Sequence, residues 1–342
     1  MTATFSIQTD FSLQAHNSFG IAAQARSYLP VTDIQTLADL HAAGVLSAQP
    51  LLVLGGGSNI LLTRDFPGLV LHMCNRGIHI VNEDDQAVYV RAAAGESWHA
   101  FVLWTLQRGL GGLENLSLIP GTVGAAPIQN IGAYGAELKD VLHEVSYFDR
   151  ISGQVLTLDK AACEFAYRDS VFKRRLKEQA IIVEVCFALP KSWQPNLRYA
   201  ELMQELAVRG VADPDPRTIS DAVISIRTRK LPDPAAIGNA GSFFKNPVVT
   251  EAQRDALLAR YPDLVNYPQA DGSVKLAAGW LIDRCGWKGK SAGAAGVYEK
   301  QALVLVNRGG ASGSDIVELA AAIQQDVAQK FDVRLEPEPV FV

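Results

Sequence analysis

Hydrophobic and polar positions predict alternating strands and helices near the start of the chain. Apolar residues three positions apart predict a helix over residues 34–40, which residue 32 or 33 caps and Gly44 ends. The apolar run 51–54 predicts a buried strand that enters a glycine loop directly, and another strand is expected at 69–73. The first 75 residues are therefore expected to form a small unit of strands and helices.

Strand patterns dominate the middle of the chain, where they surround one helix and one glycine-rich segment. The helix is expected over residues 97–108, and its aromatic side chains indicate a hydrophobic core rather than a cofactor site. Residues 109–135 are rich in glycine and only weakly periodic, which predicts a long irregular segment. Further strands are predicted at 78–81, 87–93, 143–148, 155–158 and 180–189.

Two prolines, Pro232 and Pro234, interrupt the pattern and predict a domain boundary. Before them, residues 195–215 have the pattern of an inserted loop with a short helix. After them, elements are predicted at residues 250–261, 276–285 and 300–306. Ser314 is expected to cap a final helix. The apolar face of that helix consists of Ile316, Leu319, Ala320, Ile323 and Val327.

The length and the net charge of the chain limit the number of domains and the kinds of partner that can be expected. A chain of 342 residues is expected to form two or three domains. The net charge of −5 argues against nucleic-acid binding through bulk charge, although a local basic pocket stays open. The first ten residues lack the pattern of a signal peptide, and no run approaches the roughly 20 apolar residues of a membrane span. A cytoplasmic protein without a membrane partner is therefore expected.

The four cysteines and six histidines are scattered along the chain. None has the spacing of a metal site, and no histidine lies four positions from another. Cys74, Cys163, Cys186 and Cys285 are therefore interpreted as reduced thiols, and no metal is predicted.

The first candidate for ligand binding is the loop at residues 55–59, Gly-Gly-Gly-Ser-Asn. It follows a strand, so its backbone N–H groups can turn toward an anion such as phosphate, although a tight turn explains it equally well. It is not a dinucleotide fingerprint, because the third glycine would fall at Ile60. A P-loop ending at residues 288–291 is also excluded, because Arg284 stands where that motif needs glycine.

The second candidate loop covers residues 120–135, where small residues accompany two amides. Such a segment can lie flat against a planar ligand and offer backbone hydrogen bonds to its polar edge. A dinucleotide that carries both a pyrophosphate and an isoalloxazine ring would use both loops.

Three polar side chains stand in unusual local surroundings. Arg168 can grip a carboxylate with two hydrogen bonds, although an internal pair with Asp169 is an equal alternative. Ser242 lies between glycines and two phenylalanines in the stretch 238–247, which is expected to be a loop; taken alone, it reads as a loop serine. Glu338 lies between two prolines, and an edge-strand charge is the plain alternative.

Together these stretches resemble the UDP-N-acetylenolpyruvoylglucosamine reductase family, flavin enzymes that make UDP-N-acetylmuramate for bacterial peptidoglycan. The resemblance runs over nearly the whole chain, and the region around Tyr199 looks like the form of the family with a substrate-covering tyrosine loop. Its most specific segments are Leu54–Asn59, Ile119–Gly135, Tyr167–Lys173, Lys230–Pro234, Gly238–Pro247, Lys275–Asp283 and Gln301–Asn307.

The resemblance implies an α+β fold with three domains. Residues 1–75 and 76–231 would form an FAD-binding module of the vanillyl-alcohol-oxidase type, with the tyrosine loop inserted near 195–215. Residues 232–331 would bind the substrate, and residues 332–342 would form a C-terminal strand that carries Glu338. Some relatives of this module bond FAD through a histidine in the first glycine loop. No histidine occurs between residues 42 and 71, so FAD is expected to bind non-covalently.

The implied reaction moves a hydride from NADPH to FAD and then to the methylene carbon of an enolpyruvyl ether. Ser242 matches the general acid that protonates the neighbouring carbon, and either Lys230 or a water molecule could assist it. Arg168 and Glu338 match the residues that hold the substrate carboxylate and stabilise the developing charge. Glu338 would have to be protonated there, because crowding and burial raise the pKa of a carboxyl group.

The same resemblance implies the remaining site residues, a nucleotide-sugar substrate and a monomeric protein. The residues expected to bind FAD are Gly55, Gly56, Gly57, Ser58, Asn59, Pro120, Gly121, Thr122, Gly124, Ala125, Gln129, Asn130, Gly132 and Arg227. The residues expected to bind the UDP-sugar are Tyr199, Lys230, Asn246, Lys275 and Gln301.

Two other functions compete with this interpretation. An oxidase of sugars or lactones on the same flavin module would consume oxygen without NADPH, but it has no need of the Gly-Ser-Phe-Phe stretch or the terminal glutamate. A nucleotide-sugar sensor that lost its chemistry would not be yellow when purified. The presence of Arg168, Ser242 and Glu338 together argues against the sensor.

Overall fold

The computed structural model describes residues 5–342, in which the chain divides into two compact units. Unit 1 consists of residues 5–11 and the segments Ala25–Gly57 and Phe66–Arg229. Unit 2 consists of Ser12–Gln24, Ser58–Asp65 and Lys230–Val342. The subdivision at residue 75 and the separate segment 332–342 stay predictions. The expectation about a signal peptide falls partly on residues 1–4, which lie outside the described residues.

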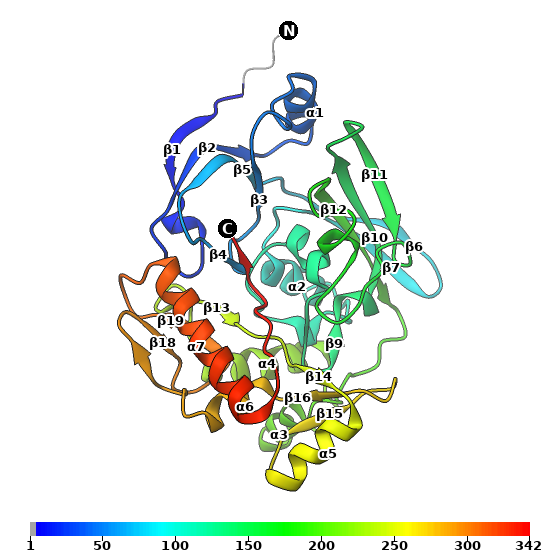
Figure 1. Cartoon of the computed structure of the whole chain (residues 1–342). Coiled ribbons are helices and arrows are strands. Elements are labelled where there is room, and N and C mark those ends of the chain that lie inside the picture. Colours follow the sequence, from blue (N-terminus) through cyan, green and yellow to red (C-terminus); the bar gives the residue numbers. More distant parts are fainter. Residues whose placement is uncertain (1–4) are drawn as a thin grey trace. The chain divides into compact units, whose positions relative to one another are not determined.

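Unit 1 begins with a four-stranded sheet in the order β1-β2-β5-β3 (Figure 1). Its elements are β1 (Gln8–Ser12), β2 (Gln24–Val31), α1 (Gln35–Ala42), β3 (Leu51–Leu54) and β5 (Phe66–Met73). Strands β2 and β3 both run parallel to β5. Helix α1 buries Leu37 and Leu40 against Leu29, Leu69 and Leu71 of the sheet, which explains the apolar spacing in the sequence.

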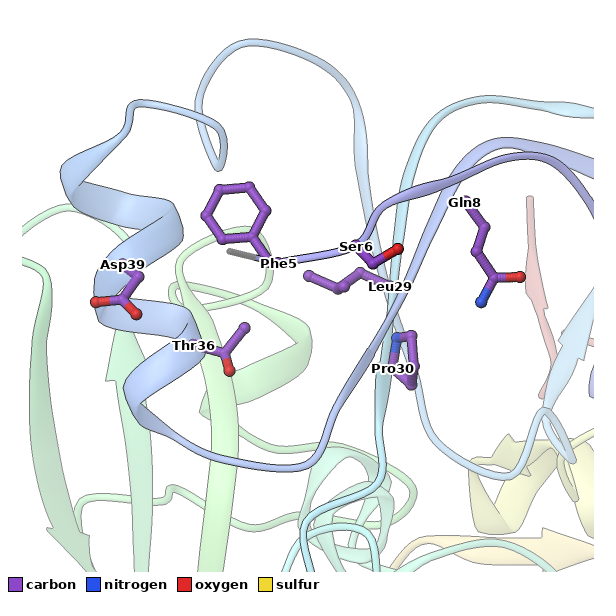
Figure 2. Close-up of a pocket in the computed structure, with 7 residues that line it drawn as sticks. All are labelled: Phe5, Ser6, Gln8, Leu29, Pro30, Thr36 and Asp39. Atoms are coloured by element: carbon purple, nitrogen blue, oxygen red, sulfur yellow. The ribbon is translucent and has the colours of Figure 1, made fainter. Parts of the chain in front are cut away.

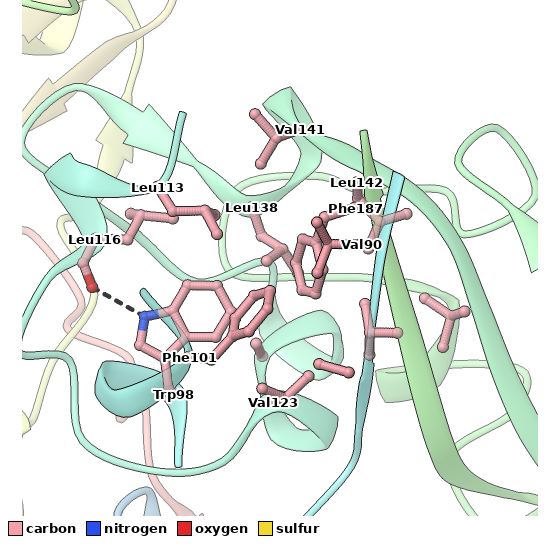
Figure 3. Close-up of a cluster of buried hydrophobic side chains, with 14 of the residues drawn as sticks. Val90, Trp98, Phe101, Leu113, Leu116, Val123, Leu138, Val141, Leu142 and Phe187 are labelled. Atoms are coloured by element: carbon pink, nitrogen blue, oxygen red, sulfur yellow. Dashed lines mark hydrogen bonds between the residues drawn. The ribbon is translucent and has the colours of Figure 1, made fainter. Parts of the chain in front are cut away.

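The second sheet of unit 1 is antiparallel and has the order β11-β10-β12-β7-β6. Its strands are β6 (Ile78–Glu83), β7 (Ala87–Ala93), β10 (Leu142–Asp149), β11 (Gln154–Asp159) and β12 (Ala180–Pro190). Helix α2 (Trp98–Leu106) packs Trp98 and Phe101 against Phe187 of β12 (Figure 3). The prediction that these aromatic side chains belong to the core is therefore confirmed.

The glycine-rich segment of unit 1 forms short 3-10 helices and a small hairpin rather than long elements. These are η2 (Glu114–Leu116), η3 (Val123–Gln129), β8 (Gly132–Ala133), β9 (Ala136–Glu137) and η4 (Leu138–Asp140), followed later by η5 (Val171–Lys173). Helices α3 (Ala200–Val208) and α4 (Pro216–Lys230) complete unit 1 and share a small apolar cluster. The expected short helix in residues 195–215 corresponds to α3.

Unit 2 contains a four-stranded antiparallel sheet in the order β13-β19-β18-β17, against which the long helix α7 packs (Figure 1). The elements are β13 (Gly238–Ser242), β17 (Ser291–Ala292), β18 (Ala295–Val297), β19 (Val304–Asn307) and α7 (Gly313–Phe331). All five apolar residues predicted for one face of the last helix are buried in α7.

A three-stranded sheet and several short elements complete unit 2. They are η1 (Gln14–His16), β4 (Ile60–Leu61), β14 (Val248–Val249), α5 (Glu251–Arg260), β15 (Asn266–Pro268), β16 (Val274–Leu276), α6 (Ala278–Arg284) and β20 (Val340–Phe341). The sheet order is β14-β16-β15, and β20 pairs in parallel with β4. The C-terminal strand is thus held by a segment from the first fifth of the chain.

Three predictions about local structure are wrong. The N-cap of α1 is Ile34, not residue 32 or 33, although Asp33 accepts the N–H of Gln35 at 3.0 Å. Ser312, not Ser314, caps α7, because Ser312 has Asp315 three residues later and the two form a capping box. The stretch expected as a loop contains strand β13, which pairs with β19 through a bulge between Asn239 and Ser242. The strand forms because β19 supplies a pairing partner some sixty residues away in the sequence.

The α+β class is confirmed by this mixture of parallel and antiparallel sheets with separate helices. Within residues 5–342, no helix combines the length and the apolar character that a bilayer span requires. Over the same range, no group of three His, Cys, Asp or Glu side chains could hold a metal ion.

Candidate active site

In unit 1 the two glycine loops touch each other backbone to backbone. A Cβ on Gly55 would lie 2.5 Å from Oγ1 of Thr122, and a Cβ on Gly56 would lie 2.9 Å from Cα of Gly121. Because real Cβ atoms do not approach this closely, glycine at these two positions lets the second loop pack on the first. Gly57 has φ +61° and turns the first loop. The tight turn that the sequence allowed is therefore present, and the phosphate-binding role of the loop stays a prediction.

Asn130 uses its side chain to hold the second loop in place. The side chain is fully buried, its Nδ2 donates to Glu137 and to the carbonyl of Ala166, and its Oδ1 accepts from the N–H of Lys139. These three bonds tie residue 130 to two neighbouring segments. A cofactor contact from Asn130 would therefore have to come from its backbone.

Arg168 lies outside the second loop in the sequence but contacts that loop near its end, at Gly132. Its Nη2 donates to the carbonyl of Gly132 at 2.8 Å, and a Cβ on Gly132 would lie 3.2 Å from its Nη1. The residue adopts the left-handed conformation, with φ +54°, which L-residues other than Asn and Asp seldom adopt. Asp169 forms an ion pair with Arg174 at 3.2 Å. Glycine at 132 thus gives the guanidinium group its place beside the loop.

A cluster of two tyrosines and an arginine lies beside the same loop. Tyr134 and Tyr199 meet edge to face, with ring centroids 5.1 Å apart. The charge of Arg227 acts on the hydroxyl of Tyr134, and its Nε donates to the carbonyl of Leu118 at 3.2 Å. Burial raises the pKa of Tyr134 to about 12 and lowers the pKa of Arg227. Tyr134 therefore keeps a neutral hydroxyl at neutral pH.

Tyr134 is a residue of this cluster that the sequence interpretation did not select. Its signal in the sequence is weak: it is the one aromatic residue in a run of glycine and alanine, at Gly132-Ala133-Tyr134-Gly135. Tyr199 precedes α3 and is 39% exposed, so Tyr134 supports only one side of its ring.

In unit 2, backbone hydrogen bonds bring Ser242 and Glu338 to neighbouring segments. The N–H of Glu338 donates to the carbonyl of Phe243 at 2.8 Å, directly after Ser242. Phe244 forms an antiparallel bridge with Pro337. Phe243 and Phe244 are both buried, whereas Ser242 is exposed. Two residues nearly one hundred positions apart in the sequence thus share one corner of the unit.

The bulge in β13 explains how Ser242 turns away from the core. Asn239 is buried, donates to the carbonyls of Pro232 and Ile237, and accepts the N–H of Gly241 at 2.9 Å. Gly241 then adopts φ +69°, and pairing resumes at Ser242 opposite Val304. The side chain of Asn239 and the glycine together create the bulge.

Gly238 has a packing role in the same strand. Its Cβ would lie 2.1 Å from the carbonyl oxygen of Phe19, which belongs to the same unit. Glycine at 238 therefore admits a neighbouring backbone rather than a ligand.

Asn246 and Gln301 contact helix α6 in unit 2, and Lys275 lies on the strand before that helix. The Oδ1 of Asn246 accepts the first N–H of α6, from Ala278, at 3.0 Å. Lys275 pairs with Val248 across β16 and β14. A Cβ on Gly279 of α6 would lie 3.1 Å from Oε1 of Gln301. The structure thus places Asn246 and Gln301 against α6, and Lys275 on the strand β16 that precedes it.

Asn59 connects the end of the first glycine loop to the C-terminal strand. Its Nδ2 donates to the carbonyl of Glu338 at 3.4 Å, and its own carbonyl accepts the N–H of Val340 at 3.0 Å. Two residues predicted from separate motifs, one for the cofactor and one for catalysis, are therefore in contact.

The predicted site residues accordingly form two groups. Those in unit 1 are Gly55, Gly56, Gly57, Pro120, Gly121, Thr122, Gly124, Ala125, Gln129, Asn130, Gly132, Arg168, Tyr199 and Arg227. Those in unit 2 are Ser58, Asn59, Lys230, Ser242, Asn246, Lys275, Gln301 and Glu338. Unit 1 offers the two glycine loops and two guanidinium groups, and unit 2 offers a hydroxyl and a carboxyl group on segments that a backbone hydrogen bond joins. A separate pocket of about 410 Å³, near α1, includes none of these residues (Figure 2).

Comparison with known proteins identifies the family. Residues 233–342 match the family model of the UDP-N-acetylenolpyruvoylglucosamine reductase C-terminal domain, and residues 27–159 match an FAD binding domain. A UDP-N-acetylenolpyruvoylglucosamine reductase from Paraburkholderia phymatum is 58% identical over 97% of this chain and 96% of its own length. The chain belongs to the UDP-N-acetylenolpyruvoylglucosamine reductase family.

Other relatives agree with this family. The reductase from Burkholderia vietnamiensis is 57% identical over 98% of this chain and 97% of its own length. A crystal structure of the reductase from Thermus caldophilus matches the fold with a TM-score of 0.66 and 23% identity, covering 99% of this chain and 98% of that one. The protein is thus an FAD-dependent oxidoreductase, as the resemblance in the sequence implied.

Proposed function

We propose that this protein reduces UDP-N-acetylglucosamine enolpyruvate to UDP-N-acetylmuramate, a precursor of peptidoglycan, with NADPH as the hydride donor. The observation that carries the proposal is the 58% identity to a reductase of that name over nearly the whole chain. The contact between the segments of Ser242 and Glu338 supports it, because the reaction needs a proton donor beside a carboxylate-binding group. A monomeric state and a cytoplasmic location stay predictions.

The residues of the two glycine loops fit FAD. Gly55, Gly56 and Gly121 bring no side chains to the place where the loops meet, and a Cβ at Gly56 would press on the backbone of Gly121 and force the loops apart. Backbone N–H groups on such a surface suit a pyrophosphate. Bound FAD would supply the hydride chemistry, by accepting a hydride from a reduced nicotinamide and passing it to the enolpyruvyl methylene carbon.

Ser242 is proposed to deliver the proton that completes the reduction. Hydride addition to the methylene carbon leaves enolate-like charge on the neighbouring carbon and its carboxylate, and a hydroxyl is a sufficient acid for such a basic centre. The exposure of Ser242 and its position after the bulge leave its hydroxyl directed away from the core of unit 2. Lys230 is the candidate to assist it.

Arg168 and Glu338 are proposed to bind the substrate carboxylate. The guanidinium group offers several N–H donors in one plane, and its bond to the carbonyl of Gly132 fixes its position. Glu338, in its protonated form, can donate a hydrogen bond to the same carboxylate. Both interactions strengthen as negative charge moves onto the carboxylate during hydride addition.

The remaining residues are proposed to bind the nucleotide sugar. Asn246 and Gln301 lie against α6 and offer two amides, and Lys275 on the strand before α6 offers an ammonium. Tyr199, which leans on Tyr134, is proposed to cover the sugar with its exposed ring face.

Replacing Ser242 by alanine tests the proposal. We expect Ser242→Ala to retain FAD and to be reduced by NADPH at the normal rate. Reoxidation of the flavin by the enolpyruvyl sugar should slow by about 10²–10⁴-fold, which is the usual effect of losing a positioned proton donor. Stopped-flow absorbance in the flavin band measures both half-reactions separately.

Ser47→Ala is a matched control, because Ser47 is exposed in unit 1 and bonds only locally to the carbonyl of Gly44. It should leave both half-reactions unchanged. Normal reoxidation in Ser242→Ala would show that Ser242 is not the proton donor.

A further inference from the structure

The backbone that leads into the second glycine loop is strained at Leu118. This residue has φ +58°, in the left-handed region that a branched side chain seldom adopts. Such a conformation persists only where its surroundings impose it. Leu118 stands two residues before Pro120, at the entrance to the loop that packs on Gly56.

Two side chains hold Leu118 from opposite sides. Its N–H donates to Nδ1 of His99 at 3.0 Å, and its carbonyl accepts from Nε of Arg227 at 3.2 Å. His99 comes from the first turn of α2, and Arg227 comes from α4. The backbone N–H and the carbonyl of Leu118 are therefore both fixed by helices outside the loop.

The first turn of α2 also holds the residues on either side. The indole Nε1 of Trp98 donates to the carbonyl of Leu116 at 2.9 Å (Figure 3), and the N–H of Trp98 donates to the carbonyl of Gly121 at 3.0 Å. Ser97 forms a bridge with Thr122. A displacement of Leu118 would therefore be transmitted to Gly121, which touches the first glycine loop.

The bond from Leu118 requires a neutral imidazole. Nδ1 can accept the N–H only when it carries no proton, and protonation would set two N–H groups against each other. Burial lowers the pKa of His99 below its ordinary value of 6.5. The charges that act on it are Arg227 and Arg217 of α4, and both lower the pKa further. The positive end of the α2 dipole acts in the same direction.

We propose that neutral His99 is a positioning residue for FAD: by accepting the N–H of Leu118 it holds the second glycine loop in the shape that binds the cofactor, and its protonation weakens FAD binding. This inference rests on FAD binding at the glycine loops. Because the pKa of His99 is lowered in the folded protein, its contribution is fully present above the ordinary histidine value and is lost as the pH falls below that value.

Two variants of His99 distinguish the effect of its hydrogen-bond acceptor from the effect of its positive charge. His99→Asn places Oδ1 near the site of Nδ1 and cannot be protonated, whereas His99→Leu removes the acceptor. The measurement is the dissociation constant of FAD from the holoenzyme, followed by flavin fluorescence between about pH 5 and pH 8. Thermal melting of each holoenzyme shows whether the variant is folded.

We expect the wild-type affinity to fall by about tenfold toward acidic pH, and His99→Asn to lose most of that dependence while binding FAD nearly as well at neutral pH. His99→Leu should bind FAD about tenfold more weakly at every pH, because the N–H of Leu118 loses its partner. His79→Asn, an exposed change on β6 of the same unit, should retain the wild-type profile.

Identical pH profiles for wild type and His99→Asn, or wild-type affinity in a folded His99→Leu, would overturn the proposal. In either case a yellow protein that still reduces the enolpyruvyl sugar would leave the proposed function intact. A wild-type protein that binds no FAD would instead contradict the family assignment of the loops.

Discussion

Single glycines in this protein serve different purposes, and the neighbouring atoms distinguish them. Gly56 and Gly238 are both places where backbones approach, but Gly56 meets the second glycine loop, whereas Gly238 meets the carbonyl of Phe19. Gly241 has open space around it and supplies a positive φ for the bulge before Ser242. The sequence predicted that the glycines of these stretches have a structural or binding role. It could not distinguish their roles, because the role of each depends on the atoms that surround it in the fold.

Gly56→Ala is expected to weaken FAD binding. Its Cβ would lie 2.9 Å from Cα of Gly121, so the loops must separate. Overpacking of this kind costs about 1–3 kcal/mol, which corresponds to roughly a 5- to 150-fold loss of FAD affinity. Flavin fluorescence measures the affinity. Gly210→Ala, at φ +68° in open space, is a control that should lower stability without weakening FAD binding.

Glu338→Ala is expected to damage turnover far more than FAD content. The side chain is proposed to act on the substrate, whereas the strand that carries it is held by backbone bonds that alanine retains. The flavin-to-protein absorbance ratio and the steady-state rate measure the two effects. Glu336→Ala is the matched control, because Glu336 lies two residues earlier and is exposed, with an ion pair to Lys245. Loss of FAD from Glu338→Ala alone would indicate a structural role.

At the scale of elements, periodicity predicted most helices, but it could not predict pairings between distant segments. The apolar faces of α1 and α7 follow directly from spacing. The strand nature of β13 does not, because a run of glycine and asparagine becomes a strand only when β19 and the side chain of Asn239 hold it. Likewise, the sequence selected Ser242 and Glu338 separately, and only the backbone pairing of their segments shows that they are neighbours.

The C-terminal strand is expected to position Glu338. Strand β20 bonds to β4 through Val340 N–H to Asn59, Val342 N–H to Leu61, and Thr63 N–H to Val342. Removing residues 340–342 abolishes these bonds, each of which contributes about 0.5–1.5 kcal/mol. We expect turnover to fall by about tenfold or more with FAD still bound.

Thr63→Val is the milder comparison for this truncation. It removes only the 2.7 Å bond from Oγ1 to the carbonyl of Val342 and keeps the shape of the side chain. It should reduce turnover much less than the truncation. Full activity in the truncated protein would show that β20 does not position Glu338.

At the scale of the whole molecule, the cysteines report on folding. Burial raises the pKa of Cys163 to about 12 and that of Cys186 to about 11, so neither forms a thiolate until the pH approaches those values. We expect iodoacetamide at about pH 8 to leave both unmodified until the protein unfolds. Cys74 and Cys285 are only half-buried and should react first. Mass spectrometry of the labelled peptides checks this order.

The family of the molecule could be predicted from several motifs that occur in one order, whereas its division into units could not. The last segment of unit 2 begins at Lys230, but Ser12–Gln24 and Ser58–Asp65 join the same unit through contacts with distant residues. One such contact is the bond from Asn307 to the carbonyl of Phe19. No local signal in those short stretches could indicate it.

The central claim, that an FAD enzyme reduces an enolpyruvyl nucleotide sugar, is tested most directly by anaerobic absorbance of the purified protein. We predict an oxidised flavin band that NADPH bleaches and that UDP-N-acetylglucosamine enolpyruvate then restores, in the absence of oxygen. A flavin that stays bleached after the sugar is added, or a purified protein with no flavin band, would contradict the account.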